Sequence, residues 1–221
     1  MREIEKIDEL WYFLDLSPSP KSIFYPYTNV SYLKPTFNNN FFYKVFVDFP
    51  INKQQWNTSY QLLLHQTLLF EYVFHITSLD DYEQAEEIIE QFQIEKYSLK
   101  PVYNGDNIDF FIENVFLTKE DILTIPMSIK DFFFKQCMNT DFGKLNILPT
   151  GDIYANLNHP ALGNIYLHSI YEIVQKELDE GKSWMRIRNE APCNTCLYQY
   201  LCPSPSDYEI AIGKPNLCRI E

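Results

Sequence analysis

Between residues 43 and 103, the order of hydrophobic and polar residues alternates between strand-like and helix-like patterns. Runs rich in aromatic and β-branched residues predict three strands, at 43–49, 71–77 and 97–103. The apolar stretch from Gln55 to Leu69 predicts a buried helix after the first strand. A second helix is predicted for the segment DYEQAEEIIEQF, because a side-chain oxygen of Ser78 or Asp80 can accept a hydrogen bond from an unpaired amide at its start.

This order of strands and helices predicts an α/β fold with a parallel sheet and right-handed crossovers. Pro101 has no amide to donate, which places the third strand at an edge or at a strand end. Three strands are too few for a closed barrel of eight, so we expect part of a barrel or a small α/β layer. The first 40 residues are of uncertain structure: a helical spacing near the N-terminus is broken at Pro18 and Pro20, and the rest suggests at most a short strand.

Short helices and a hairpin are predicted further along the chain. Thr118 and Asp121 are spaced as a capping box at the start of a short helix, and Ser128 is placed to begin another. The segment GKLNILPTGDIYAN predicts two strands joined by a turn at 149–152.

A last helix is expected from about Ser169 to Glu180, with Gly181 as its C-terminal stop. Beyond Arg188 the chain becomes a cysteine-bearing loop. We therefore divide the sequence into three parts: an N-terminal segment of uncertain structure at 1–40, an α/β region at 41–125 and a smaller cysteine-rich region at 126–221.

Composition and charge exclude several classes of function. Hydrophobic residues make up 46% of the 221 residues, which is enough for a folded core. Neither GxGxxG nor GxxxxGK[ST] occurs, which argues against a nucleotide-binding loop. The net charge of −12 disfavours nucleic acid as a partner. With no apolar run long enough for a membrane span and no signal-peptide pattern in MREIEKIDELWYF, we expect a cytoplasmic protein that does not bind membranes.

The cysteines carry the strongest chemical signal. Cys193 and Cys196 are separated by two residues, Cys202 follows after five more, and Cys218 comes from a later segment. A Cys-x2-Cys turn can present two sulfurs to one metal, and thiolates suit either zinc or an iron–sulfur cluster. A reducing compartment favours metal ligation over disulfides, and the spacing leaves zinc and iron–sulfur open. The fifth cysteine, Cys137, is expected to be a small buried hydrophobic residue.

Basic residues precede the cysteines in the segment GKSWMRIR. Lys182, Arg186 and Arg188 form a local patch that either offsets the negative charge of a thiolate site, binds an acidic peptide or is ordinary surface charge. His159, in the loop after the hairpin, is expected to have a structural role.

Together, these features resemble a known family. Cys137, then Gly151 and Asn156 with four residues between them, the segment LGNI at 162–165 and the cysteine block occur in the order typical of the SPASM domain. This domain is the auxiliary iron–sulfur region of radical-SAM enzymes that modify peptides. The resemblance covers about residues 137–221 and implies a small cysteine-rich domain with a β-hairpin and a helix.

The sequence departs from the SPASM pattern at two positions. Asn156 and Ser206 stand where two-cluster members have cysteines, and both positions serve the same auxiliary cluster in that family. The resemblance therefore implies that one 4Fe-4S cluster remains, held by Cys193, Cys196, Cys202 and Cys218, and that Cys137 is an unpaired remnant. Zinc in the same four-cysteine site is the alternative.

A third departure concerns catalysis. The Cys-x3-Cys-x2-Cys motif that binds S-adenosylmethionine in radical-SAM enzymes does not occur, so no catalytic residue is assigned. The α/β region would then be a partial radical-SAM-like β/α barrel. The chain resembles the pseudo-radical-SAM or SPASM-only proteins of Bacteroidetes, in GG-leader or grasp-with-spasm systems. This resemblance implies a non-catalytic accessory protein in the maturation of ribosomally synthesised peptides, with a precursor peptide or a partner maturase as its ligand. The alternatives are an electron-transfer partner of a separate enzyme and a zinc-binding structural module.

Overall fold

The structure is a computed structural model that describes residues 20–32, 41–65, 69–126, 128–131 and 141–219. These residues form two compact units, one spanning Ser19–Val115 and the other beginning at Phe116. The helical spacing predicted near the N-terminus and Cys137 lie outside the described residues. Among the described helices, none is long and apolar enough to cross a membrane.

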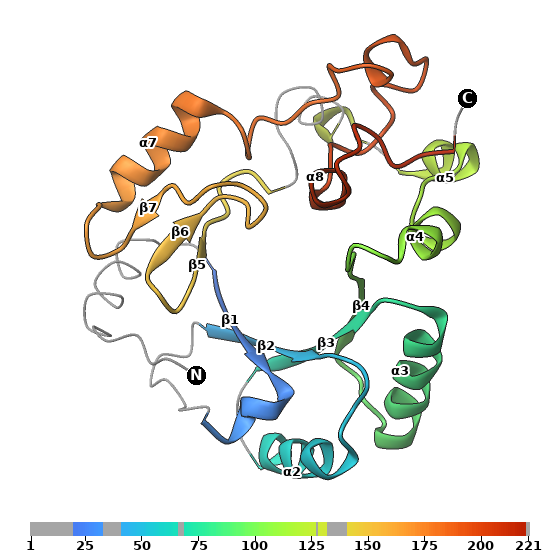
Figure 1. Cartoon of the computed structure of the whole chain (residues 1–221), viewed down its shortest axis with the longest axis vertical. Helices are drawn as coiled ribbons and strands as arrows, with labels where there is room; N and C mark the ends of the chain where they lie inside the picture. Colours follow the sequence, from blue (N-terminus) through green and yellow to red (C-terminus); the bar gives the residue numbers. More distant parts are fainter. Residues whose placement is uncertain (1–19, 33–40, 66–68, 127, 132–140, 220–221) are drawn as a thin grey trace. The chain divides into compact units, whose positions relative to one another are not determined.

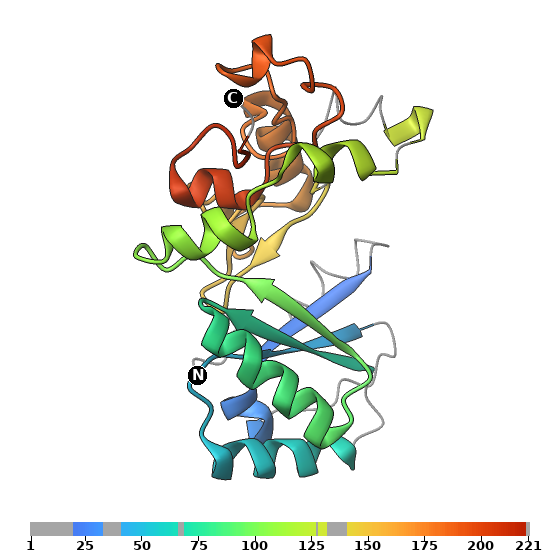
Figure 2. The ribbon, with the colours of Figure 1, turned by 90° about the vertical axis from the view of Figure 1, so that its right-hand side faces the viewer.

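A parallel sheet with helices on one face forms the first unit. Its strands, in the spatial order β1-β2-β3-β4, are β1 (Lys21–Pro26), β2 (Phe41–Val47), β3 (Phe70–Ile76) and β4 (Tyr97–Pro101). Each neighbouring pair is parallel. Helices α2 (Lys53–Leu64) and α3 (Leu79–Phe92) connect consecutive strands and lie on the same face of the sheet (Figures 1 and 2). The short helix α4 (Ile108–Asn114) follows the sheet.

The three predicted strands and the parallel α/β arrangement are confirmed. The structure adds β1, which lies in the segment of uncertain assignment and is followed by a 3₁₀ helix, η1 (Tyr27–Tyr32). The strand that contains Pro101 lies at an edge of the sheet, as predicted. Helix α2 ends at Leu64, before the predicted end, and Ser78 rather than Asp80 is the cap of α3.

The core of the first unit lies between the sheet and the two helices. Val45, Val47 and Phe74 are completely buried and face Trp56 and Leu63 of α2. The Trp56 ring also lies among other aromatic rings of this core, including those of Tyr27, Tyr72 and Phe92. Burial of such large apolar side chains supplies most of the favourable free energy of folding, which explains why this unit needs no covalent cross-link.

The second unit is poorer in regular structure. It contains α5 (Lys119–Thr124), a three-stranded antiparallel sheet of β5 (Asn146–Ile147), β6 (Asp152–Tyr154) and β7 (Gly163–Asn164), α7 (Ile170–Glu180), the 3₁₀ helix η2 (Cys193–Thr195) and α8 (Asp207–Ile212). Its core is a cluster around Ile153, Ile173 and Trp184. No other large apolar cluster is formed by its described residues, so the cysteine-bearing segment beyond Arg188 lacks a core of its own.

The predicted capping signals are confirmed where the structure describes them. Thr118 and Asp121 form the capping box of α5, and Ser169 starts α7 in the same way. Gly181 ends α7 with a φ of +62°, a conformation that glycine adopts at low cost. Ser128 bonds with Asp131 as a cap does, but the rest of that predicted helix lies outside the described residues.

Candidate functional site

The four clustered cysteines line one cavity. Cys193, Cys196, Cys202 and Cys218 surround about 20 Å³ of space, together with Leu117, Arg188, Gln199 and Leu217. All four are free thiols. The structure therefore brings together the four residues that the sequence predicts as ligands, although they come from two separate segments.

The first three cysteines are positioned by two tight turns. Pro192 precedes η2, and the amide of Cys196 donates to the carbonyl oxygen of Cys193 at 3.1 Å, which closes the Cys-x2-Cys turn. The amide of Cys202 then donates to the carbonyl oxygen of Tyr198 at 3.0 Å. These turns explain how three thiols so close in sequence face the same cavity.

Cys218 reaches the cavity because its backbone pairs with a distant segment. The amide of Leu117 donates to the carbonyl oxygen of Leu217, and the amide of Arg219 donates to the carbonyl oxygen of Leu117, both at 3.0 Å. Leu117 and Cys218 thereby form an isolated parallel bridge. The spacing predicts that the fourth cysteine comes from a returning segment. The bridge to Leu117, at the start of the second unit, is what brings that segment to the cavity.

Three of the four sulfurs have nitrogen donors beside them. The amide of Tyr198 lies 3.4 Å from Sγ of Cys196, and Nδ2 of Asn216 lies 3.3 Å from Sγ of Cys218. Nη1 of Arg188 lies 3.8 Å from Sγ of Cys193. Donors directed at sulfur stabilise the thiolate form and tune a bound metal centre.

Without a metal, the cavity favours the protonated form of Cys202. Burial raises the pKa of the Cys202 thiol, and the other three cysteines raise it further, whereas the charge of Arg188 acts in the opposite direction. A metal that takes four thiolates must therefore displace protons on binding.

The thiols surround the cavity without standing at ligand positions. In the part of the chain that the structure describes, no three His, Cys, Asp or Glu side chains are arranged to hold a metal ion. A metal would have to draw the sulfurs towards a common centre. The donor set fits zinc or an iron–sulfur cluster, and ligation itself stays a prediction.

Arg188 connects the cavity with the polypeptide around it. Its Nε donates to the carbonyl oxygen of Pro203 at 2.6 Å, and its Nη2 lies 2.8 Å from Oε1 of Glu209. Burial alone would lower the pKa of Arg188, but the carboxylate of Glu209 and the Cys193 thiol raise it above the usual value. Glu209, buried at 5% exposure, was not among the predicted residues, although the Ser206-x2-Glu209 spacing of a capping box is visible in the sequence.

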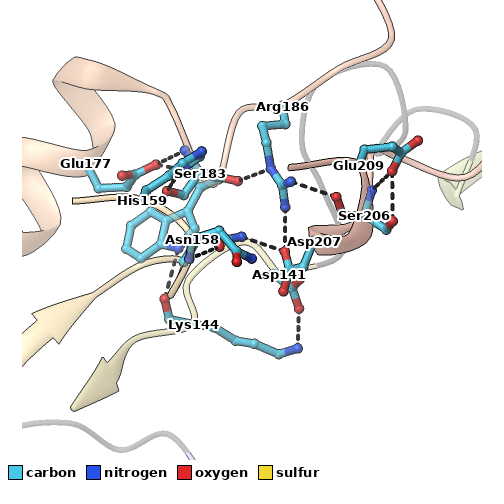
Figure 3. A network of polar contacts seen from close by, with 12 residues as sticks. Asp141, Lys144, Asn158, His159, Glu177, Ser183, Arg186, Ser206, Asp207 and Glu209 are labelled. Atoms are coloured by element: carbon cyan, nitrogen blue, oxygen red, sulfur yellow. Dashed lines mark hydrogen bonds and ion pairs between the residues drawn. The ribbon is translucent and has the colours of Figure 1, made fainter. Parts of the chain in front are cut away.

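The other two members of the predicted basic patch lie elsewhere. Lys182 pairs with Glu180 and is largely exposed. Arg186 donates to the carbonyl oxygens of Ser183 and Ser206 and pairs with Asp207 (Figure 3). Only Arg188 of the three therefore contributes to the lining of the cysteine cavity.

Asn156 and Ser206, the two positions at which the sequence departs from the SPASM pattern it resembles, meet in a polar network. The buried amide of Asn156 donates to Oδ1 of Asp207 at 2.5 Å, and Ser206 caps α8 through Glu209. In the same network, with Arg186 between it and Asp207, Nδ1 of His159 lies 2.9 Å from Oγ of Ser183 (Figure 3). Hydrogen bonds hold these side chains within the fold, so the structural role predicted for His159 agrees with its surroundings.

The carboxylate of Glu177 anchors this network to α7. Glu177 is 1% exposed, and its Oε1 accepts hydrogen bonds from the amides of Ser183 and Trp184 at 2.6 and 2.8 Å. The indole of Trp184 donates to the carbonyl oxygen of Lys144. The segment that leads to the cysteines thus starts from a fixed turn.

Compared with models of protein families, curated proteins and solved structures, the chain matches none of them.

Proposed function

We propose that the chain is a non-catalytic accessory protein in the maturation of ribosomally synthesised peptides, and that Cys193, Cys196, Cys202 and Cys218 hold one 4Fe-4S cluster. The observation that carries the proposal is the single cavity that these four thiols line. Nitrogen donors beside three of the sulfurs provide the surroundings that a thiolate-bound centre needs.

Four thiolates leave no coordination position open, which restricts the chemistry of such a centre. It can cross-link its surroundings or carry an electron, but it cannot bind a substrate at the metal. The segment from Arg188 to Arg219 contains only short helices and contributes little to the described core. Cross-linking would therefore supply folding free energy where burial supplies little, which favours a structural role over electron transfer.

The proposed ligand is a precursor peptide or a partner maturase, as the resemblance to SPASM-only proteins implies. The loop between Cys196 and Cys202 exposes apolar side chains, with Leu197 at 93% and Tyr200 at 54% exposure. A metal at its two ends would hold this loop rigid, and rigid loops with exposed aromatic and apolar side chains make good anchors for a partner.

Zinc is the second candidate for the site, because the cavity is small. Its 20 Å³ exceed only slightly the roughly 10–15 Å³ that one water needs. A single ion thus requires less outward movement of the cysteines than a four-iron cluster. Zinc would make the chain a structural module whose partner surface is the same loop.

Anaerobic purification with iron, sulfide and zinc analysis tests the proposal. We expect about four irons and four sulfides per chain, a brown colour and loss of both in Cys196→Ser, whereas the matched variant Cys137→Ser keeps them. One equivalent of zinc in a colourless protein would select the second candidate. A preparation with neither metal after anaerobic reconstitution would exclude both.

The accessory role needs a separate test with its genomically neighbouring precursor peptide and maturase. We expect the cluster-loaded chain to retain one of them in a pull-down, and Leu197→Asp to weaken retention without loss of iron. Release of 5′-deoxyadenosine by the chain alone would contradict the non-catalytic assignment.

A further inference from the structure

Arg188 lines the cysteine cavity and contacts several of the segments around it. Its guanidinium contacts the carbonyl oxygen of Pro203, the carboxylate of Glu209 and the sulfur of Cys193. Its own carbonyl oxygen accepts a hydrogen bond from Nε2 of Gln199 at 2.6 Å. The contacts of this one residue therefore reach both sides of Cys202 as well as the Cys-x2-Cys turn.

Glu209 fixes the direction of that guanidinium. Oε1 of Glu209 lies against Arg188, while Oε2 accepts from the hydroxyl of Ser206 at 2.8 Å and from its amide. Both side chains of the ion pair are nearly buried, at 10% and 5% exposure. The hydrogen bonds from Ser206 to Oε2 restrict rotation of this buried carboxylate, and the ion pair at Oε1 therefore holds the guanidinium of Arg188 in place.

On this basis we propose that Arg188 is the positioning residue of the four-cysteine site, oriented by Glu209. This inference rests on the function proposed above. Arg188 keeps the segments of Cys193 and Cys202 beside each other and directs an N–H group at a ligand sulfur. These contacts lower the free energy needed to bring four thiolates together around one centre. Helix α8, which carries no ligand, belongs to the site because it supplies the carboxylate.

Arg186 provides a natural control for this proposal. It lies two residues earlier, has nearly the same side-chain exposure (11% against 10%), and also pairs with a carboxylate of the α8 region, that of Asp207. Its guanidinium donates to backbone oxygens of Ser183 and Ser206, but it does not line the cysteine cavity. The two arginines therefore differ in contact with the thiols and in the exposure of the paired carboxylate, which is 52% for Asp207 and 5% for Glu209.

The test compares Arg188→Lys with Arg186→Lys in the full chain, reduced and metal-free, with Co²⁺ and Zn²⁺ as probes. Zinc affinity is measured by competition with a chromophoric chelator, and the cobalt–thiolate absorption per bound ion reports the sulfur ligands. We expect Arg188→Lys to weaken zinc binding by about 10–100-fold and to reduce the cobalt–thiolate absorption. Arg186→Lys should keep both close to the wild-type values, while thermal melting of the metal-free variants shows similar losses.

Equal zinc affinities for the two lysine variants would overturn the inference and leave the proposed function standing. If the wild-type chain bound neither probe through thiolates, the proposed function would fail together with the inference. Glu209→Gln gives an independent readout should Arg188→Lys not fold: weaker zinc binding supports the role of the pair, and unchanged binding contradicts it.

Discussion

The side-chain amide of Asn156 donates a hydrogen bond to Oδ1 of Asp207 at 2.5 Å, and so ties the turn after β6 to the start of α8. Asn156 is 4% exposed, and its own Oδ1 accepts from the amide of Asn158 at 2.8 Å. Both hydrogen-bonding groups of this side chain are thus used. Asn156 and Ser206 therefore belong to one polar network.

Replacement of Asn156 by Ala should destabilise the second unit. The change leaves the amide of Asn158 without its acceptor and removes the bond to Asp207, for an expected loss of about 1–3 kcal/mol in the free energy of unfolding. Denaturant unfolding of the reduced, metal-free protein measures it. Asn158→Ala, at an exposed position that contributes its backbone amide, is the matched control and should change stability little. Equal losses in the two variants would contradict a specific role for the Asn156 side chain.

The bridge between Leu117 and Cys218 leads to a prediction about metal removal. A metal on Cys218 would hold the C-terminal segment against Leu117, because the two residues are joined by backbone hydrogen bonds. Removal of the metal by a chelator should therefore speed amide hydrogen exchange at Leu117 and Arg219. The amide of Ile165, bonded to Gly151 within the second unit, should exchange at the same rate with and without metal.

Unchanged exchange at Leu117 on chelation, in a sample shown to lose its metal, would mean that the bridge does not depend on the centre. Faster exchange at Ile165 as well would indicate unfolding of the whole second unit rather than release of this segment.

Much of the first unit could be predicted because its sequence and its tertiary packing agree. The three runs of aromatic and β-branched residues became β2, β3 and β4, and Ser78 capped α3. The strand β1 is harder to recognise, because none of its six residues is fully buried: four are half-buried and two are exposed. Its place at the sheet edge comes from pairing with β2, which local sequence does not encode.

For the site, ligand spacing predicted which cysteines meet but not what holds them. The convergence of Cys218 depends on hydrogen bonds with Leu117, a contact between segments far apart in sequence. Arg188 was recognised only as part of a patch with Lys182 and Arg186, because three basic residues close in sequence carry no information about the direction of each side chain. The direction of the Arg188 side chain depends on the buried carboxylate of Glu209, which only the tertiary structure brings close to it.

A side chain at Gly151 should lower the free energy of unfolding of the second unit. Its φ is +87°, and a Cβ there would lie 2.7 Å from Cε2 of Tyr166. Gly143 has a similar φ of +82° with no atom within 4 Å of a Cβ. We expect Gly143→Ala to cost about 1–2 kcal/mol from backbone strain alone, and Gly151→Ala to cost about 1–3 kcal/mol more from overpacking. Denaturant unfolding of both variants gives the difference. Equal costs would show that the Tyr166 ring moves away freely.

The acid sensitivity of the second unit should depend in part on His159. Burial lowers the pKa of His159, the charge of Arg186 lowers it further, and Glu177 and Asp207 oppose the shift. Below about pH 6.5 the unfolded chain therefore binds more protons at this residue than the folded chain does. The contribution of His159 to stability is complete above that pH and falls as the pH decreases towards the folded-state pKa.

Replacement of His159 by Gln removes this titration while retaining a side chain that can bond to Ser183. Unfolding free energies of the reduced, metal-free protein at about pH 8 and about pH 5.5 should thus differ less in His159→Gln than in the wild type. An NMR titration of the His159 ring should give a lower pKa in the folded protein than in urea, because the loss of water on burial and the positive charge of Arg186 both disfavour the imidazolium. A ring that titrated at the same pH in both states would mean that Glu177 and Asp207 fully compensate burial and the charge of Arg186, and the pH dependence of the two proteins would then coincide.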